Sequence, residues 1–159
     1  MEKYSSDSEA RFGCKGKKNF WFGCKRRVSM DMSGGLINKV AVTPANVSDH
    51  KVLEEVCPDG GMVFDDKAYC VEEAQQTLLA KGCHSGVIFR NNLKAKDRDK
   101  DRWLSAVRMP FEGVFARVNK KARYRGVAKN LFQVLMQALV FNLKRMIRIV
   151  AKPIPLIAG

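Results

Sequence analysis

The chain has 159 residues, of which 46% are hydrophobic, 28% charged and 9% aromatic. This length suits one domain with a sizeable core, and the apolar fraction excludes disorder of the whole chain. With only 12 Gly, 5 Pro and 5 Cys, the sequence is neither collagen-like nor a disulfide scaffold.

The formal net charge of +13 lies entirely in the second part of the sequence. Residues 1–89 contain 12 basic and 12 acidic side chains, whereas residues 90–159 contain 17 basic and 4 acidic ones. Such asymmetry is typical of a nucleic-acid-binding surface. An anionic membrane is the second candidate partner, and a solvated helix face is the alternative that needs no ligand.

The sequence predicts neither a membrane-spanning helix nor a signal peptide. The most apolar stretch, residues 131–143, is shorter than the roughly 20 residues that a bilayer-spanning helix needs. Residues 1–18 contain no apolar run that resembles a signal peptide. We therefore expect a cytoplasmic protein.

The first part of the sequence predicts a β-hairpin followed by a short helix. Residues 1–18 are polar and basic and are expected to form a flexible segment. Apolar and polar side chains alternate over residues 20–32, which predicts a half-buried strand. A glycine-containing turn at residues 33–35 leads into a second strand over residues 36–43. A short helix over residues 48–56 follows, and the serine at its start can cap it.

The middle of the sequence predicts two buried strands that flank a helix. The apolar residues 62–64 lie between turn residues, as in a central strand. A helix is expected over residues 71–81, with Gly82 at its C-terminal end. A second short strand is expected over residues 86–90, and residues 91–102 are expected to form a charged, solvated loop.

The last part of the sequence predicts two helices. Apolar residues recur at helical spacing over residues 103–118 and again over residues 127–150. Two prolines prevent the second helix from continuing into the tail at residues 153–159. The order of the predicted elements indicates an α/β protein with a mixed sheet, flanking helices and a long C-terminal helix.

Two adjacent aspartates, Asp65 and Asp66, follow the apolar strand at residues 62–64. Open α/β sheets place their ligands at the carboxyl ends of strands, and carboxylates there suit Mg²⁺. An exposed turn or a cap for the next helix is the alternative. The sequence does not decide which of the two aspartates would face a metal.

Glu112 is the only acidic residue after Asp101 and lies among many basic residues. It could be a metal ligand beside a phosphate-binding surface. It could equally form a local salt bridge with Arg108, which lies four residues earlier on the same face of the predicted helix.

A basic cluster with an aromatic residue lies between the two predicted C-terminal helices. It contains Lys120, Lys121, Arg123, Tyr124 and Arg125. Arginine binds phosphate with two hydrogen bonds, and a tyrosine ring can pack on a sugar or a base. This composition predicts contact with DNA phosphates, whereas the alternative is a basic turn between helices.

Six sequence blocks occur together over nearly the whole chain. They are SDSEAR (6–11), FGCK (22–25), GLINKVAVTPANVSDHKVL (35–53), VFDDKAY (63–69), PFEGVFARVNKKARYRGVAKN (110–130) and FNLKR (141–145). In this order they resemble a bacterial insertion-sequence transposase, of the class with a DDE catalytic domain and an RNase H-like fold.

The resemblance implies a DNA transposase that cuts at transposon ends and joins the 3′ hydroxyl to target DNA. In this class three carboxylates hold two divalent ions, Mg²⁺ or Mn²⁺, on either side of the scissile phosphate. Asp66 matches the second family aspartate and Glu112 the family glutamate, so both are the expected catalytic and metal-binding residues. Arg108 matches an arginine four residues before that glutamate, and Lys120 lies within one residue of a family lysine; both are expected to contact DNA.

The chain departs from the family pattern at several positions. The first catalytic aspartate of the family lies on an earlier strand, upstream of the block at residues 6–11. Asp7 and Asp31 are the nearest acidic residues, and the family has a non-catalytic aspartate at each of these places. Arg27 stands where a histidine is common, and Cys24 replaces a tyrosine.

We therefore expect a carboxyl-terminal portion of a transposase from a truncated gene, catalytically incomplete. Residues 19–152 would form a partial RNase H-like domain that lacks the first strand. The expected partners are transposon-end and target DNA, and a homodimer and a location at the bacterial nucleoid are compatible with the resemblance. The alternative function is that of a non-catalytic basic DNA-binding remnant.

Overall fold

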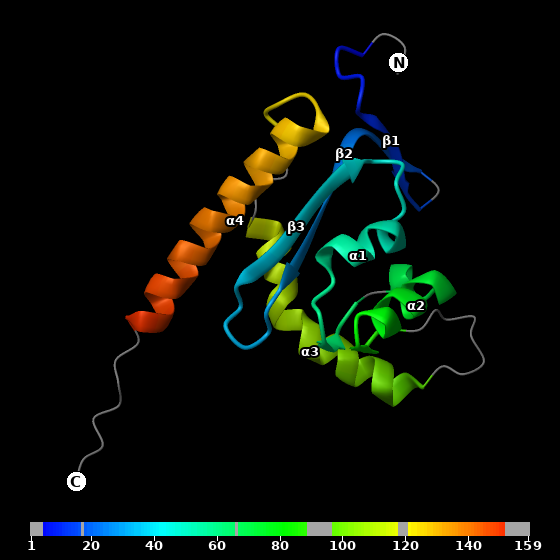
Figure 1. Cartoon of the computed structure of the whole chain (residues 1–159), viewed down its shortest axis with the longest axis vertical. Coiled ribbons are helices and arrows are strands. Elements are labelled where there is room, and N and C mark those ends of the chain that lie inside the picture. The colour runs from blue at the N-terminus through cyan, green and yellow to red at the C-terminus, as the bar shows by residue number, and fades with distance from the viewer. Residues whose placement is uncertain (1–4, 17, 66, 89–96, 118–120, 152–159) are drawn as a thin grey trace.

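The computed structural model describes residues 5–16, 18–65, 67–88, 97–117 and 121–151 (Figure 1). The strands are β1 (Arg11–Lys15), β2 (Asn19–Met30), β3 (Ile37–Pro44), β4 (Gly61–Val63) and β5 (Cys83–Ser85). The helices are α1 (Leu53–Val56), α2 (Glu72–Ala80), α3 (Arg98–Arg117) and α4 (Val127–Val150), with short 3₁₀ turns η2 (Asp49–Val52) and η3 (Lys67–Tyr69). The predicted α/β class with a long C-terminal helix is confirmed. Within the described ranges, no helix has the length and apolar character needed to cross a membrane.

The β2–β3 hairpin forms as predicted and is covered on both faces. The strands pair antiparallel, with Val28 opposite Val40 and Arg27 opposite Ala41. Because neighbouring residues of a strand point to opposite faces, Val28 and Val40 pack near α4, whereas Ala41 packs with residues of η2 and α1. Figure 1 shows α4 along one side of the hairpin and α1 on the other.

β4 and β5 form a second sheet, separate from the one that contains the hairpin. β4 and β5 pair in parallel, while β1, β2 and β3 form a three-stranded antiparallel sheet. The single mixed sheet expected from the sequence is therefore not what the described residues form. The core of the second sheet includes Leu53 of α1, Leu78 of α2 and Cys83 of β5. Burying each leucine contributes about 2 kcal/mol.

The two strands of the second sheet differ from the prediction in position and burial. β5 begins three residues before the expected range of 86–90, and Val87 lies in the core directly after it. Residues 89 and 90 lie outside the described residues. Met62, in the middle of β4, is 51% exposed. β4 is therefore not the buried central strand that its apolar sequence predicted, because no strand covers both of its edges in the described part of the chain.

The start of α3 lies inside the predicted loop at residues 91–102, part of which is outside the described residues. The Asp97 carboxylate accepts hydrogen bonds from the amides of Asp99 (2.9 Å) and Lys100 (3.1 Å). This local cap satisfies amides at the helix end and favours a helix where charge alternation alone suggested a loop. By contrast, Ser48 precedes η2 but makes no capping hydrogen bond.

Residues 5–16, which belong to the segment expected to be flexible, make defined contacts with other elements. β1 pairs with the first half of β2. Before it, Asp7 Oδ2 accepts a hydrogen bond from the Gly126 amide (3.1 Å), and Glu9 Oε2 accepts one from the Val127 amide (2.9 Å). These amides begin α4, whose own N-cap residue is a glycine without a side chain. Two carboxylates from the distant N-terminal segment therefore cap α4, where the helix dipole favours negative charge.

α4 has the bounds that the sequence predicted. Val134 and Ala138 are buried. Asn142 binds the backbone of Ile37 twice, because its Oδ1 accepts from the Ile37 amide (2.8 Å) and its Nδ2 donates to the Ile37 carbonyl (2.8 Å). These contacts fix the helix against the start of β3. The predicted tail at residues 153–159 lies outside the described residues.

The Asp7 cap predicts a pH-dependent loss of stability. Asp7→Ala should lower the free energy of unfolding by about 1 kcal/mol at neutral pH, because it leaves the Gly126 amide at the start of α4 without its acceptor. The hydrogen bond from Gly126 holds the pKa of Asp7 below its ordinary value of 3.8. The contribution is thus present above that unfolded-state value and is lost as the pH falls through the lower folded-state value.

Urea denaturation at about pH 7 and about pH 2 would measure this difference. The Ser8→Ala variant, which removes a neighbouring exposed hydroxyl, serves as the control. An Asp7→Ala variant as stable as the unmodified chain at neutral pH would show that the cap contributes nothing.

Candidate active site and nucleic-acid interface

A groove between the two sheets contains the region in which the sequence predicts catalytic carboxylates. Its volume is about 620 Å³, and residues of β2, α1, β4 and α3 line it. Asp65, two residues after β4, and Glu112 on α3 both lie in this lining. We call it the carboxylate groove. Asp66, the predicted catalytic neighbour of Asp65, lies outside the described residues.

Asp65 is half-buried next to the core of the second sheet. Its backbone carbonyl accepts a hydrogen bond from the Ile88 amide (3.3 Å), which holds the chain after β4 in an extended form. The pKa of the nearby Cys57 thiol is raised to about 12, chiefly by burial and to a smaller extent by the hydrogen bond to Cys83 and the charge of Asp65.

Glu112 forms the local ion pair that the sequence allowed and also lies in the groove. The distance from Arg108 Nη2 to Glu112 Oε1 is 3.8 Å. The Glu112 side chain is 62% exposed, whereas that of Arg108 is 23% exposed. Such an exposed pair at positions i and i+4 contributes only about 0.3–0.5 kcal/mol. The salt bridge is therefore too weak to exclude binding of the Glu112 carboxylate to another cation.

The described carboxylates can contribute to a metal site but do not form a complete one. Within the described ranges, no three His, Cys, Asp or Glu side chains cluster in a way that could hold a metal ion. Asp65 and Glu112, which come from distant parts of the sequence, still line one groove. Carboxylate oxygens are the ligands that Mg²⁺ and Mn²⁺ prefer.

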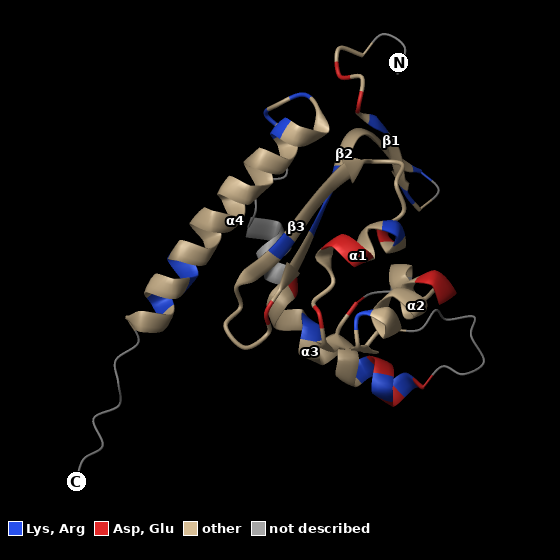
Figure 2. Cartoon of the chain, viewed as in Figure 1, with Lys and Arg blue, Asp and Glu red and all other residues tan. Residues whose placement is uncertain are grey.

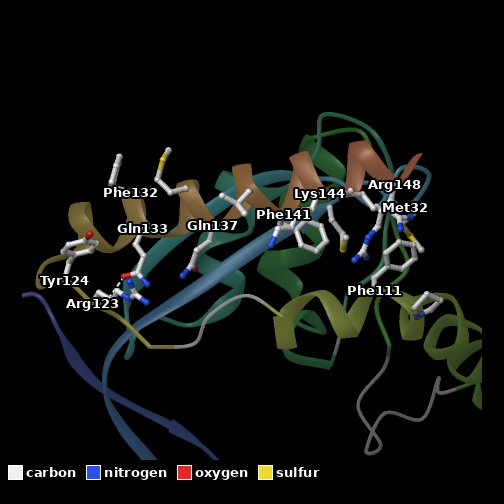
Figure 3. A pocket seen from close by; sticks show the side chains of 16 residues that line it. Met32, Phe111, Arg123, Tyr124, Phe132, Gln133, Gln137, Phe141, Lys144 and Arg148 are labelled. Carbon is white, nitrogen blue, oxygen red and sulfur yellow. Dashed lines mark hydrogen bonds between the residues drawn. The ribbon is translucent and has the colours of Figure 1, made fainter. Parts of the chain in front are cut away.

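A second and larger groove lies along α4. Its volume is about 930 Å³, and its lining contains four cations, Arg123, Lys144, Arg145 and Arg148, but no acidic residue. Figure 3 shows Arg123 and Tyr124 at one end and Lys144 and Arg148 at the other. We call it the basic groove. Arginine, lysine and aromatic side chains in one open groove provide the contacts that a nucleic-acid backbone and its bases require.

The predicted DNA-binding residues are distributed unequally between the two grooves. Arg123 lines the basic groove and Arg108 lines the carboxylate groove, whereas Lys121 and Arg125 are exposed outside both linings. Gln133 holds the preceding loop in place, because it accepts from the Arg123 amide (2.9 Å) and donates to the Lys121 carbonyl (3.0 Å). Lys120 lies outside the described residues.

The cations on the C-terminal half of α4 are not among the DNA-binding residues predicted from the sequence. Lys144 and Arg148 follow Gln137 and Phe141 at intervals of three or four residues, so that all four line one face of the helix. This helical spacing of three or four residues could have placed these cations on one face from the sequence alone. Figure 2 shows basic residues on this half of α4 and in the loop before it, whereas α1 and α2 carry acidic residues and the start of α3 carries both kinds.

The two grooves adjoin each other. Met30, Met32 and Phe111 belong to the lining of both. In Figure 3, Met32 and Phe111 lie at the same end of the basic groove as Lys144 and Arg148. The cations of α4 therefore lie at the end of the basic groove that leads to the carboxylates.

A buried arginine supports the wall of the carboxylate groove. Arg27, where the family often has histidine, is only 7% exposed. Its Nη2 donates to Asp49 Oδ1 (2.8 Å) and to the Val47 carbonyl (2.8 Å), and its Nη1 donates to the Thr43 hydroxyl. These bonds tie β2 to the end of β3 and to the loop that follows it, so residues 43–49 of the block at residues 35–53 have a structural role.

These contacts predict that two substitutions in the carboxylate groove lower the free energy of unfolding by different amounts. Arg27→Met should lower the free energy of unfolding by about 2 kcal/mol or more, because it leaves the partners of a buried cation without their donors. Glu112→Gln should change it by no more than about 0.5 kcal/mol, because the bond to Arg108 is exposed. Parallel urea denaturation of both variants would measure this contrast. If Glu112→Gln proved as destabilising as Arg27→Met, Glu112 would be a structural residue.

Comparison with known proteins identifies the family. A family model described as a transposase DDE domain matches residues 2–143. No curated protein and no solved structure matches the chain. The matched span includes both sheets, α3 and most of α4, whereas Lys144, Arg145 and Arg148 of the basic groove lie beyond its end. On the evidence of this match over most of its length, the chain belongs to the transposase DDE domain family.

Proposed function

We propose that the chain acts in metal-dependent DNA strand cleavage and strand transfer at the ends of an insertion element. The observation that carries this proposal is the continuity of the two grooves, with carboxylates in one and only cations among the charged residues of the other. A DNA backbone bound along α4 would lead toward Asp65 and Glu112. Membership of a transposase family supports the same reaction class.

Asp66 and Glu112 are proposed as two of the three metal-binding carboxylates, with Asp65 as the neighbour that could replace Asp66. The presence of Asp65 and Glu112 in one groove is compatible with a shared site for hard cations. When bound, two Mg²⁺ or Mn²⁺ ions would activate the attacking oxygen and stabilise the leaving oxygen of the scissile phosphate.

The basic residues would bind and orient the DNA. We assign phosphate contacts to Lys144 and Arg148 near the carboxylates and to Arg123 at the far end of the basic groove, where Tyr124 could stack on a base. Lys120, Lys121 and Arg125 would extend this contact around the loop before α4. Arg108 is held by Glu112 only weakly, so it could turn to a phosphate once Glu112 binds a cation.

We further propose that these residues form an RNase H-like domain without its first strand and without its first catalytic aspartate. The two nearest aspartates are engaged elsewhere: Asp7 accepts hydrogen bonds from Gly126, and Asp31 accepts them from the backbone of Gly34 and Ser33. Both therefore act as turn or cap residues. The chain should bind DNA but cleave it poorly, and as a transposase it would work at the nucleoid and as a homodimer.

DNA binding should depend steeply on salt and on the cations of the basic groove. Replacing both Lys144 and Arg148 by alanine should reduce the slope of log K against log salt by about 2, since each lost phosphate contact removes about 0.9. Lys51→Ala, which removes an exposed lysine of η2 outside both linings, is the control. Fluorescence anisotropy with a DNA duplex at several salt concentrations would measure the slopes. Equal slopes for the double variant and the control would contradict the proposed DNA path.

The metal part of the proposal predicts that weak Mn²⁺-dependent nicking, if any, disappears in Asp66→Ala and Glu112→Gln. The binding of Mn²⁺ itself, followed by its paramagnetic signal, should weaken in both variants, because each removes a charged oxygen ligand. Efficient nicking by the unmodified chain would overturn the proposed incompleteness while supporting the site. If neither substitution changed metal binding, the non-catalytic DNA-binding function would hold instead.

A further inference from the structure

The strands β1 and β2 combine aromatic and basic side chains without an acidic one. Between Glu9 and Asp31, the sequence contains seven basic and four aromatic residues and no acidic residue. The neutral balance of residues 1–89 conceals this, because their acidic residues lie outside this segment. Figure 2 shows basic residues at both ends of β1. Such a segment complements a ligand that carries both negative charge and flat apolar groups.

The aromatic residues divide between the two faces of the β1–β2 hairpin. Phe12 lies opposite Phe22, and Cys14 lies opposite Phe20. Residues that pair across two strands share a face, whereas neighbours along a strand point to opposite faces. The three phenylalanines therefore lie on one face of the hairpin, and Trp21 lies on the other.

Trp21 packs on its own sheet. A side-chain carbon at Gly13 would collide with the Trp21 ring and with Ala45, so the ring lies directly over the backbone of β1. On the same face, Lys25 Nζ lies 6.0 Å from the centroid of this ring. Trp21 therefore has a structural role, and the opposite face of the hairpin is the one that can receive a ligand.

The three phenylalanines form an exposed aromatic surface, which we call the phenylalanine patch. Phe20 is 66% exposed and Phe12 is 40% exposed. The rings of Phe12 and Phe22 meet edge to face, with 5.1 Å between their centroids. Exposed Lys15 and Lys18 lie at the turn end of the hairpin. Contiguous exposed apolar groups with a polar rim are typical of a binding surface.

The phenylalanine patch lies on the same side of the sheet as α4. Val28 of β2 packs near this helix. Arg26 Nη1 donates to Gln137 Oε1 of the helix over 3.1 Å. Because every second residue of a strand points to the same face, Phe22 and Phe20 continue the face that carries these two residues. The patch therefore extends the surface on which α4 lies.

The patch also follows the end of the basic groove that contains Arg123 and Tyr124. Asp7, four residues before β1, accepts a hydrogen bond from the Gly126 amide, two residues after Tyr124. β1 therefore begins close to the start of α4. Asp7 and Glu9 are the acidic residues nearest to β1 in the sequence, and both carboxylates cap α4. A strand of DNA that leaves the basic groove at this end would reach the patch.

We propose that the phenylalanine patch binds unpaired bases of single-stranded DNA. Phe20 would stack on one base and the pair of Phe12 and Phe22 on another, while Lys15 and Lys18 would contact phosphates. The bases of a duplex are stacked on one another and cannot bind in this way. The inference rests on the proposed function for the identity of its ligand, but it needs neither metal nor cleavage.

Two oligonucleotides of equal charge test base stacking. One contains about twelve thymidines, and the other has the same sugars and phosphates without bases. The unmodified chain should bind the thymidine strand about tenfold more tightly or better, because each stacked base adds to the affinity. Fluorescence anisotropy would measure both affinities. The ratio should persist as salt is raised, whereas both affinities fall through counterion release. Equal affinities for the two strands would overturn the proposal.

Substitutions of Phe20 separate base stacking from general apolar adhesion. Phe20→Ala and Phe20→Leu should each bind the thymidine strand about tenfold more weakly, because neither side chain has a flat ring. Phe20→Tyr should bind it as the unmodified chain does. All three variants should bind the strand without bases normally, which verifies their folding. Full binding of the thymidine strand by Phe20→Leu would contradict stacking.

Leu79→Ala is the matched control, because it removes another exposed apolar side chain, on α2 and outside both groove linings. It should bind both oligonucleotides as the unmodified chain does. A loss as large as that of Phe20→Ala, for the thymidine strand only, would show that the hairpin is not the place where bases bind.

These measurements distinguish failure of the patch from failure of the proposed function. If the unmodified chain binds both oligonucleotides equally, while the Lys144 and Arg148 double variant still has a lower salt slope with a duplex, the patch fails and the DNA path along α4 stands. If Phe20→Ala loses the preference for bases, while the double variant and its control have equal salt slopes, the patch stands and the path along α4 fails.

Discussion

The buried guanidinium of Arg27 constrains the arrangement of the two sheets. A cation removed from water costs several kcal/mol unless it is paired, and here Asp49, Val47 and Thr43 provide the acceptors. Because Asp49 begins η2, this network fixes the start of η2 and α1 against β2. Val52 then packs under the hairpin, while Leu53 packs in the core of the second sheet. One short helical segment thereby links both cores.

This link determines the surface on which the proposed function depends. With η2 and α1 placed between the sheets, β2 and β4 border one groove, and α3 contributes Glu112 and Phe111 to it. The N-terminal carboxylates that cap α4, together with the contacts of Asn142, hold the basic face of α4 next to this groove. Residues far apart in the sequence thus combine into a cationic path that ends at carboxylates, which is the feature expected of a DNA phosphoryl transferase.

Features with a local origin could be predicted from the sequence. The hairpin follows from alternation, and α4 follows from helical spacing that ends near two prolines. Other features could not be predicted from the sequence, because they depend on partners far along the chain. They are the division into two sheets, the β1 strand and the capping of α4 by Asp7. For the site, two aspartates after a predicted strand indicated either Asp65 or Asp66 as a metal ligand. The resemblance to a transposase indicated Asp66 together with Glu112. Lys144 and Arg148 were not identified, because cations near a helix C-terminus also occur for the sake of the helix dipole alone.

The proposed function depends most on a divalent metal held jointly by carboxylates after β4 and on α3. Fe²⁺ can replace Mg²⁺ in such sites, and with ascorbate and peroxide it cleaves the polypeptide next to the bound ion. The account predicts cuts near residues 65–66 and near Glu112, both suppressed by excess Mg²⁺ and both lost in Glu112→Gln. Cuts at only one of these places, or cuts that Glu112→Gln leaves unchanged, would contradict a shared metal site.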